Sequence, residues 1–140
     1  MEMMADFNAE EFLDIGKKIA DRYASECGYR TAIGRVYYAC HLIGSDATTQ
    51  KGWFPGRHYD GRDHLGLCRA LKEQNQKQIE YKLRDLIELR EHADYHVKKP
   101  SNGGCRYCNN VVDKQVWERA KAIASNILPR LQAIYPKQPK

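Results

Sequence analysis

Apolar side chains recur along most of the chain at intervals of three and four residues, which is the spacing of one face of an α-helix. Asn8 and Glu11 form a pattern typical of a helix start, and Gly28 is expected to end the first helix. No stretch alternates apolar and polar residues in the way of a half-buried strand. The predicted helices cover Asn8–Glu26, Arg30–Gly44, a short segment from Asp63 to Leu71, Gln78–Val97, and a last segment that starts at Asn110 or Asp113.

Glycine, proline and polar residues interrupt this pattern. A long loop is predicted over Ser45–Arg62, a turn within Lys72–Lys77, and a second loop with a Cys-x-x-Cys motif over Pro100–Asn109. Pro129 is expected to kink or end the last helix. The length of 140 residues suits one domain, so the sequence predicts a single all-α domain, an antiparallel bundle of about five helices.

The composition narrows the class of protein. Hydrophobic residues make up 42% and charged residues 29%, which is typical of a globular chain, and the formal net charge of +5 permits contact with nucleic acid. No stretch approaches the roughly 20 apolar residues of a membrane span, and the first residues are acidic, unlike a signal peptide. Five cysteines, an odd and unevenly spaced set, do not indicate a disulfide framework. We therefore expect a cytoplasmic protein without a membrane contact.

Two motifs stand in order along the chain. The second predicted helix contains Arg35-Val36-Tyr37-Tyr38-Ala39 and the fourth contains Leu89-Arg90-Glu91-His92-Ala93-Asp94-Tyr95, with His64-Leu65 between them. Together these segments resemble the HEPN superfamily, and the likeness covers roughly residues 30 to 97. The resemblance implies a HEPN-like all-helical homodimer, often coupled to a nucleotidyltransferase, whose active members cleave RNA without a metal.

The resemblance also implies a site. Arg90 followed by His96 matches the spacing of an arginine and a histidine that lie in a cleft between two protomers of the active members, and that pair is the expected catalytic pair here. A guanidinium can hold phosphate oxygens, while an imidazole can exchange protons near neutral pH. Four further residues of the motifs are expected as binding residues, namely Arg35, Tyr38, Asp94 and Tyr95.

The helical spacing gives a second reason, independent of the resemblance, to expect a special role for Arg90. At about 100° per residue, Arg90 and Asp94 fall on the apolar stripe of the fourth helix, so a permanent charge points inward. Such a charge must be paired or must face an interface cavity. An Arg90–Asp94 ion pair one turn apart is therefore a structural alternative, and it is compatible with phosphate binding.

A metal site competes for one of these residues. His92 and His96 lie one helical turn apart, and Cys105 and Cys108 follow a Gly-Gly turn, which together make a complete donor set for tetrahedral zinc. A zinc-bound His96 cannot act in RNA cleavage, so the two hypotheses exclude each other. Such a zinc would be structural, and a Cys105–Cys108 redox pair is a third possibility.

Three functions follow from these patterns. The leading hypothesis is a HEPN-type, metal-independent endoribonuclease that requires no cofactor and acts as the toxin of a toxin–antitoxin pair, with RNA as substrate. The first alternative is a non-catalytic HEPN module that binds a nucleotidyltransferase partner or a nucleotide. The second alternative is a helical interaction module stabilised by zinc.

Overall fold

The computed structural model describes residues 8–53, 62–95 and 111–136, and it confirms an all-helical bundle within those ranges. No strand occurs among these residues, and no helix formed by them combines the length and apolarity needed to cross a bilayer. The helices are α2 (Glu10–Arg22), α3 (Glu26–Gln50), α4 (Arg62–Glu73), α5 (Lys77–Tyr95) and α6 (Lys114–Ile134).

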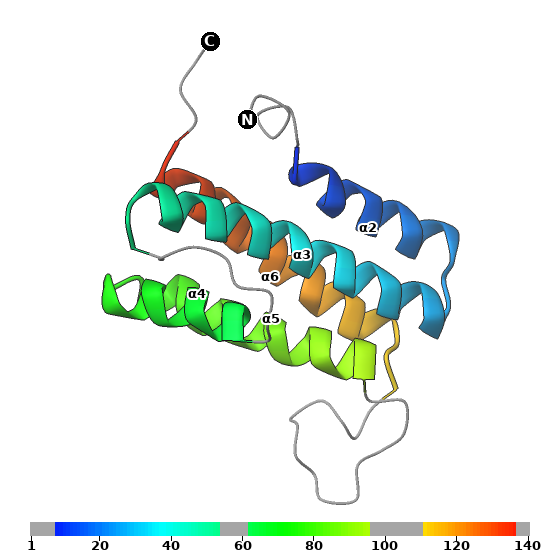
Figure 1. Ribbon diagram of the computed structural model, residues 1–140. Helices are drawn as coiled ribbons and strands as arrows, with labels where there is room; N and C mark the ends of the chain where they lie inside the picture. The colour runs from blue at the N-terminus through cyan, green and yellow to red at the C-terminus, as the bar shows by residue number, and fades with distance from the viewer. Residues whose placement is uncertain (1–7, 54–61, 96–110, 137–140) are drawn as a thin grey trace, which may run out of the picture.

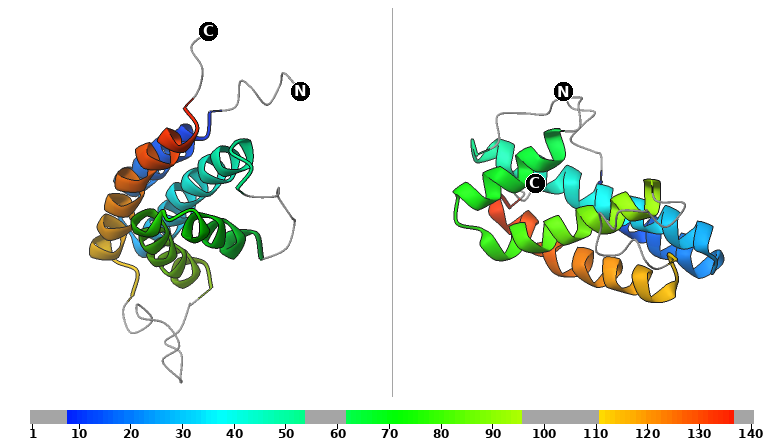
Figure 2. Two further views of the ribbon diagram at one scale, coloured as in Figure 1. Left: turned by 90° about the vertical axis from the view of Figure 1, so that its left-hand side faces the viewer. Right: turned by 90° about the horizontal axis from the view of Figure 1, so that it is seen from below.

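Helix α3 lies at the centre of the bundle and contacts each of the other four helices (Figures 1 and 2). The apolar stripe predicted for this segment is buried, since Ile33, Val36 and Cys40 are fully buried and Tyr37 is 2% exposed. The stripe packs with buried leucines of α4 and α5 and with the inner face of α6 in one hydrophobic core. Side chains of α4, α5 and α6, which are far apart in the sequence, thus pack together against α3.

Both ends of α3 lie outside the predicted segment. The helix begins after Ser25, whose hydroxyl oxygen accepts a hydrogen bond from the Gly28 amide, so the prediction that Gly28 ends a helix was wrong. A Cβ atom on Gly28 would lie 1.9 Å from the Tyr23 carbonyl oxygen, and the glycine therefore serves the close approach of α2 and α3.

The predicted loop also starts later than expected, because α3 continues from Gly44 to Gln50. Thr48 is fully buried, and its hydroxyl donates to the Gly44 carbonyl at 2.8 Å inside the helix. This bond satisfies a polar group that the sequence pattern placed in a loop. Of the predicted Ser45–Arg62 loop, residues 54–61 lie outside the described residues.

Pro129 does not end α6, which continues to Ile134; of the two expected effects, the kink stays a prediction. A proline leaves the carbonyl four residues earlier without its helical partner, here that of Ser125. Both Ser125 and Pro129 are exposed, and water can therefore bond to this carbonyl. At the other end of α6, Asp113 caps the helix by accepting from the Val116 amide, as the sequence predicts.

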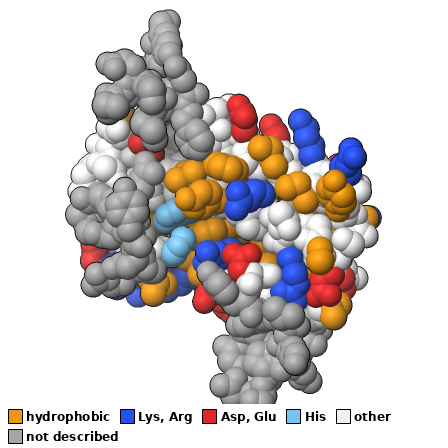
Figure 3. Space-filling view, turned by 45° about the vertical axis from the view of Figure 1, so that its right-hand side comes forward, with side chains coloured by type: hydrophobic (Ala, Val, Ile, Leu, Met, Phe, Trp, Pro, Cys, Tyr) orange, Lys and Arg blue, Asp and Glu red, His pale blue; other side chains and the backbone are white. Residues whose placement is uncertain are grey.

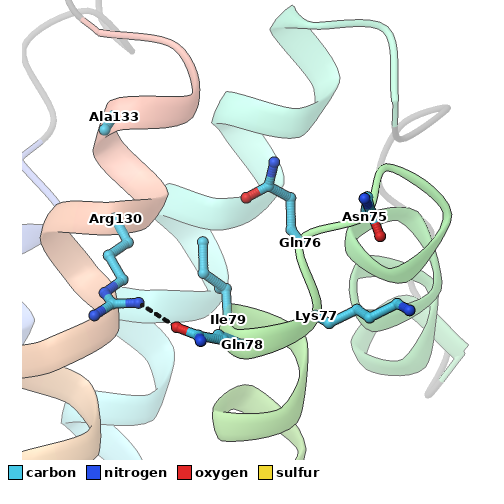
Figure 4. Close-up of a pocket in the computed structure, with 7 residues that line it drawn as sticks. All are labelled: Asn75, Gln76, Lys77, Gln78, Ile79, Arg130 and Ala133. Atoms are coloured by element: carbon cyan, nitrogen blue, oxygen red, sulfur yellow. Dashed lines mark hydrogen bonds between the residues drawn. The ribbon is translucent and has the colours of Figure 1, made fainter.

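The predicted turn between α4 and α5 is confirmed. Asn75 has a φ of 63°, the left-handed conformation that allows a sharp reversal. The turn lies against the end of α6, where the Arg130 guanidinium donates to the Gln78 side-chain oxygen at 3.2 Å (Figure 4). The short connection fixes α4 and α5 as neighbours, and both helices contact α3.

Two of the glycines of α3, Gly28 and Gly34, give a matched test of how α2 and α3 pack. We expect Gly28→Ala to lower the free energy of unfolding by about 1–3 kcal/mol, because its Cβ meets backbone atoms. Gly34→Ala should leave stability unchanged or raise it by up to about 1 kcal/mol, because its Cβ meets only the Asp94 carboxylate at 3.7 Å among the described residues. Urea unfolding measures both, and equal effects of the two variants would contradict the packing.

Candidate functional site

Tyr37 of α3 contacts polar side chains from two other helices. Its hydroxyl is hydrogen-bonded to Nδ1 of His64 on α4, and the guanidinium carbon of Arg90 on α5 lies 5.5 Å from the centre of its ring. Arg90 and His64 therefore both contact one phenol, although they are separated by 26 positions in the sequence. We call Tyr37, His41, His64 and Arg90 the Tyr37 cluster.

His41 completes the cluster from the next turn of α3. Its ring lies nearly parallel to that of Tyr37, with centroids 5.9 Å apart and an interplanar angle of 19°. The His41 and His64 ring centroids are 4.5 Å apart, so two imidazoles lie in contact. His41 is buried and His64 is half-buried. In Figure 3, histidine side chains reach the surface beside apolar and basic side chains.

Arg90 forms the predicted ion pair with Asp94. Its Nε lies 2.9 Å from an Asp94 carboxylate oxygen, and the two side chains are 23% and 36% exposed. The charge expected to point inward is thus half-buried, over a ring on one side and beside a carboxylate on the other. A guanidinium has five donors in a planar fork, a geometry that matches phosphate oxygens as well as carboxylate oxygens.

Burial controls the protonation of the neutral groups here. It raises the pKa of the Tyr37 hydroxyl well above its ordinary value, although the Arg90 charge acts in the opposite direction. The phenol therefore keeps its hydrogen, and its oxygen can donate to Nδ1 of His64 or accept from a protonated Nδ1, according to the tautomer of the ring. Burial also raises the pKa of the Cys40 and Cys68 thiols to about 12, so neither thiol is a reactive thiolate near neutral pH.

The predicted binding residues Arg35 and Tyr38 lie next to the cluster on α3. The Arg35 guanidinium carbon is 5.5 Å from the ring centre of Phe12 on α2 and 5.9 Å from that of Tyr38. Tyr38 in turn lies nearly parallel to His41, with centroids 6.2 Å apart and an angle of 15°. We call Phe12, Arg35 and Tyr38 the Phe12–Tyr38 platform, which is continuous with the Tyr37 cluster through His41.

Several predicted site residues cannot be placed in this geometry. His96, Cys105 and Cys108 lie outside the described residues, and of Tyr95 only its position as the last residue of α5 is described. His92 is 1% exposed, and its carbonyl accepts from the Arg30 guanidinium at 3.1 Å. Within the described part of the chain, no group of three or more histidine, cysteine or acidic side chains is arranged to hold a metal. The zinc site stays a prediction.

The sequence pattern did not assign His41, His64 or Phe12 to the site. His41 follows Tyr37 by four residues and so shares its face of α3, which was a usable indication. His64 stood in the motif order but was given no role, because its contact with Tyr37 depends on how α4 packs against α3. Phe12 was interpreted only as part of the core face of its helix.

Comparison of the chain with family profiles, with curated proteins and with solved structures gave no match. The HEPN resemblance therefore rests on the two motifs and their order.

The Tyr37–His64 bond can be tested by stability. We expect Tyr37→Phe to lower the free energy of unfolding by about 0.5–1.5 kcal/mol, because the ring stays while the bond to His64 is lost. Tyr81→Phe is the control, since Tyr81 is 68% exposed, and it should change stability by less than about 0.5 kcal/mol. Equal urea midpoints for the two variants would contradict the bond.

Proposed function

We propose that the protein is a metal-independent endoribonuclease of the HEPN type, with the Tyr37 cluster as part of its active site. The observation that carries the proposal is the contact of Arg90 and His64 with the same buried tyrosine ring. This arrangement fixes a phosphate-binding group and a proton-exchanging group on one side of the bundle. The HEPN motifs support the choice of RNA as substrate.

Arg90 has the role of phosphate clamp. Contact with the Tyr37 ring and the Asp94 carboxylate holds the guanidinium in one orientation before substrate arrives. A fixed cation stabilises the negative charge that grows on the phosphate oxygens as the reaction proceeds, and it does so without reorganising. Arginine suits this role better than lysine because its planar fork matches two phosphate oxygens.

The imidazoles have the role of proton exchange. In the proposed reaction the ribose 2′-oxygen forms a bond to phosphorus and the bond from phosphorus to O5′ breaks. One imidazole takes the 2′ proton, and a second, protonated imidazole gives a proton to O5′, so the products are a 2′,3′-cyclic phosphate and a 5′-hydroxyl. His64 is the half-buried member of the cluster and is assigned one of these roles; His41, or the His96 that the resemblance implies, takes the other.

A binding module without catalysis is the second candidate, and the Arg90–Asp94 pair favours it. The carboxylate offsets part of the guanidinium charge, and exposed Glu91 adds a negative charge next in sequence to Arg90. In that case the Tyr37 cluster would recognise a nucleotide or a nucleotidyltransferase partner. Such a module would bind RNA or its partner equally well after the imidazoles are removed.

RNA cleavage in EDTA separates the two candidates. We expect wild type to cut single-stranded RNA in the presence of the chelator and to leave 2′,3′-cyclic phosphate ends. Arg90→Ala should lower the rate by about 100-fold or more, and Arg90→Lys should recover only part of it. His64→Ala should lower the rate by about 100-fold or more as well.

Arg130→Ala is the matched control, because Arg130 is an exposed arginine of α6 that bonds to Gln78, outside the Tyr37 cluster, and its rate should equal that of wild type. His41→Ala and His96→Ala, assayed in parallel, identify the second imidazole. Absence of wild-type cleavage beyond the Arg90→Ala background, with RNA still bound, would replace the nuclease by the binding module.

A further inference from the structure

The Phe12–Tyr38 platform presents ring surface to solvent beside the proposed active site. Tyr38 is 40% exposed, and Phe12 is half-buried and meets Tyr38 edge to face at 5.6 Å. The Arg35 guanidinium lies against both rings. Figure 3 shows basic side chains set among apolar ones on the same face as the histidines.

The platform is joined to the Tyr37 cluster by near-parallel rings. Tyr38 and Tyr37 each lie nearly parallel to His41, at 15° and 19° to its plane. At the far end of this row, Arg90 lies over the Tyr37 ring, so one guanidinium lies at each end. Such a row fits a linear polymer in which flat ring systems and negatively charged groups alternate at short spacing.

We propose that the Phe12–Tyr38 platform stacks the base of a nucleotide next to the phosphate held at Arg90, which makes unpaired RNA the substrate. The inference rests on the proposed function for the identity of that phosphate. Aromatic and guanidinium faces stack on any base, whereas the faces of bases inside a duplex are already covered by their neighbours. The platform therefore selects single strands with little preference for sequence.

Charge favours RNA over other possible occupants of this apolar surface. Arg35, the cation of the platform, belongs to a chain with a net charge of +5, and a phosphate backbone is the partner that neutralises it. A purely apolar partner would leave the guanidinium desolvated without an anion. A second copy of this chain would bring another arginine to the same place.

Binding of an uncleavable strand tests the platform independently of catalysis. The probe is a fluorescent 2′-O-methyl oligonucleotide, which lacks the attacking hydroxyl, measured by anisotropy as a single strand and as a duplex. We expect the single strand to bind at least about 10-fold more tightly than the duplex. Tyr38→Ala should weaken single-strand binding by about 5- to 100-fold, and Tyr38→Phe should restore it.

Tyr81→Ala is the control for loss of an exposed tyrosine, and it should bind as wild type does. Arg35→Gln should weaken binding and lower its dependence on salt, because one phosphate contact is lost. Circular dichroism melting of each variant checks that the helices remain folded.

Binding by Tyr38→Ala within twofold of wild type, equal affinity for the duplex, or no binding by wild type would each overturn the platform. Self-association that Tyr38→Ala abolishes while RNA binding is unchanged would do so too, and would assign the surface to a second copy. Cleavage of ordinary RNA tests the proposed nuclease separately. If wild type binds the strand but does not cleave RNA, the platform stands and the nuclease is contradicted. If wild type cleaves RNA and Tyr38→Ala binds as wild type does, the nuclease stands and the platform is contradicted.

Discussion

The buried phenol of Tyr37 is the constraint on which the rest of the site depends. A hydroxyl in the core must have a hydrogen-bond partner, and a guanidinium near the core must have an electron-rich surface or an anion beside it. Tyr37 meets both needs at once, because His64 bonds to its oxygen and Arg90 lies over its ring. Three helices are thereby held in one register, and the same contacts that stabilise the bundle orient the groups proposed to act on RNA.

Much of the fold could be predicted from the sequence, because a three-to-four-residue spacing reports directly which face of a helix is buried. The stripe around Val36 and the inward position of Arg90 followed from that rule, and both are found. The ends of the helices were harder to predict from the sequence. Gly28 resembled a stop signal but serves a close contact between helices, and Pro129 lies at an exposed position inside a helix that continues past it. These outcomes depend on neighbours in space that a linear pattern does not contain.

The site was predicted only where it lies on one helix. The Arg90–Asp94 pair is one turn apart and was expected, whereas the contact of His64 with Tyr37 requires the packing of α4 on α3. Two arginines, Arg35 and Arg90, lie over the rings of adjacent tyrosines, and both rings lie nearly parallel to His41. Positive charge is thus concentrated along a short aromatic row, and Asp94 limits how strongly an anion is held there before the reaction.

The proposed function requires direct contact between nucleic acid and the Tyr37 cluster. The most direct measurement is an NMR titration with single-stranded DNA, which lacks the attacking 2′-hydroxyl, in protein carrying labelled histidine and arginine. The account predicts that the imidazole signals of His64 and the side-chain Nε signal of Arg90 shift together and saturate, while those of His92, 1% exposed, stay in place. Unshifted His64 and Arg90 signals, with the response confined to arginines such as Arg130, would contradict it.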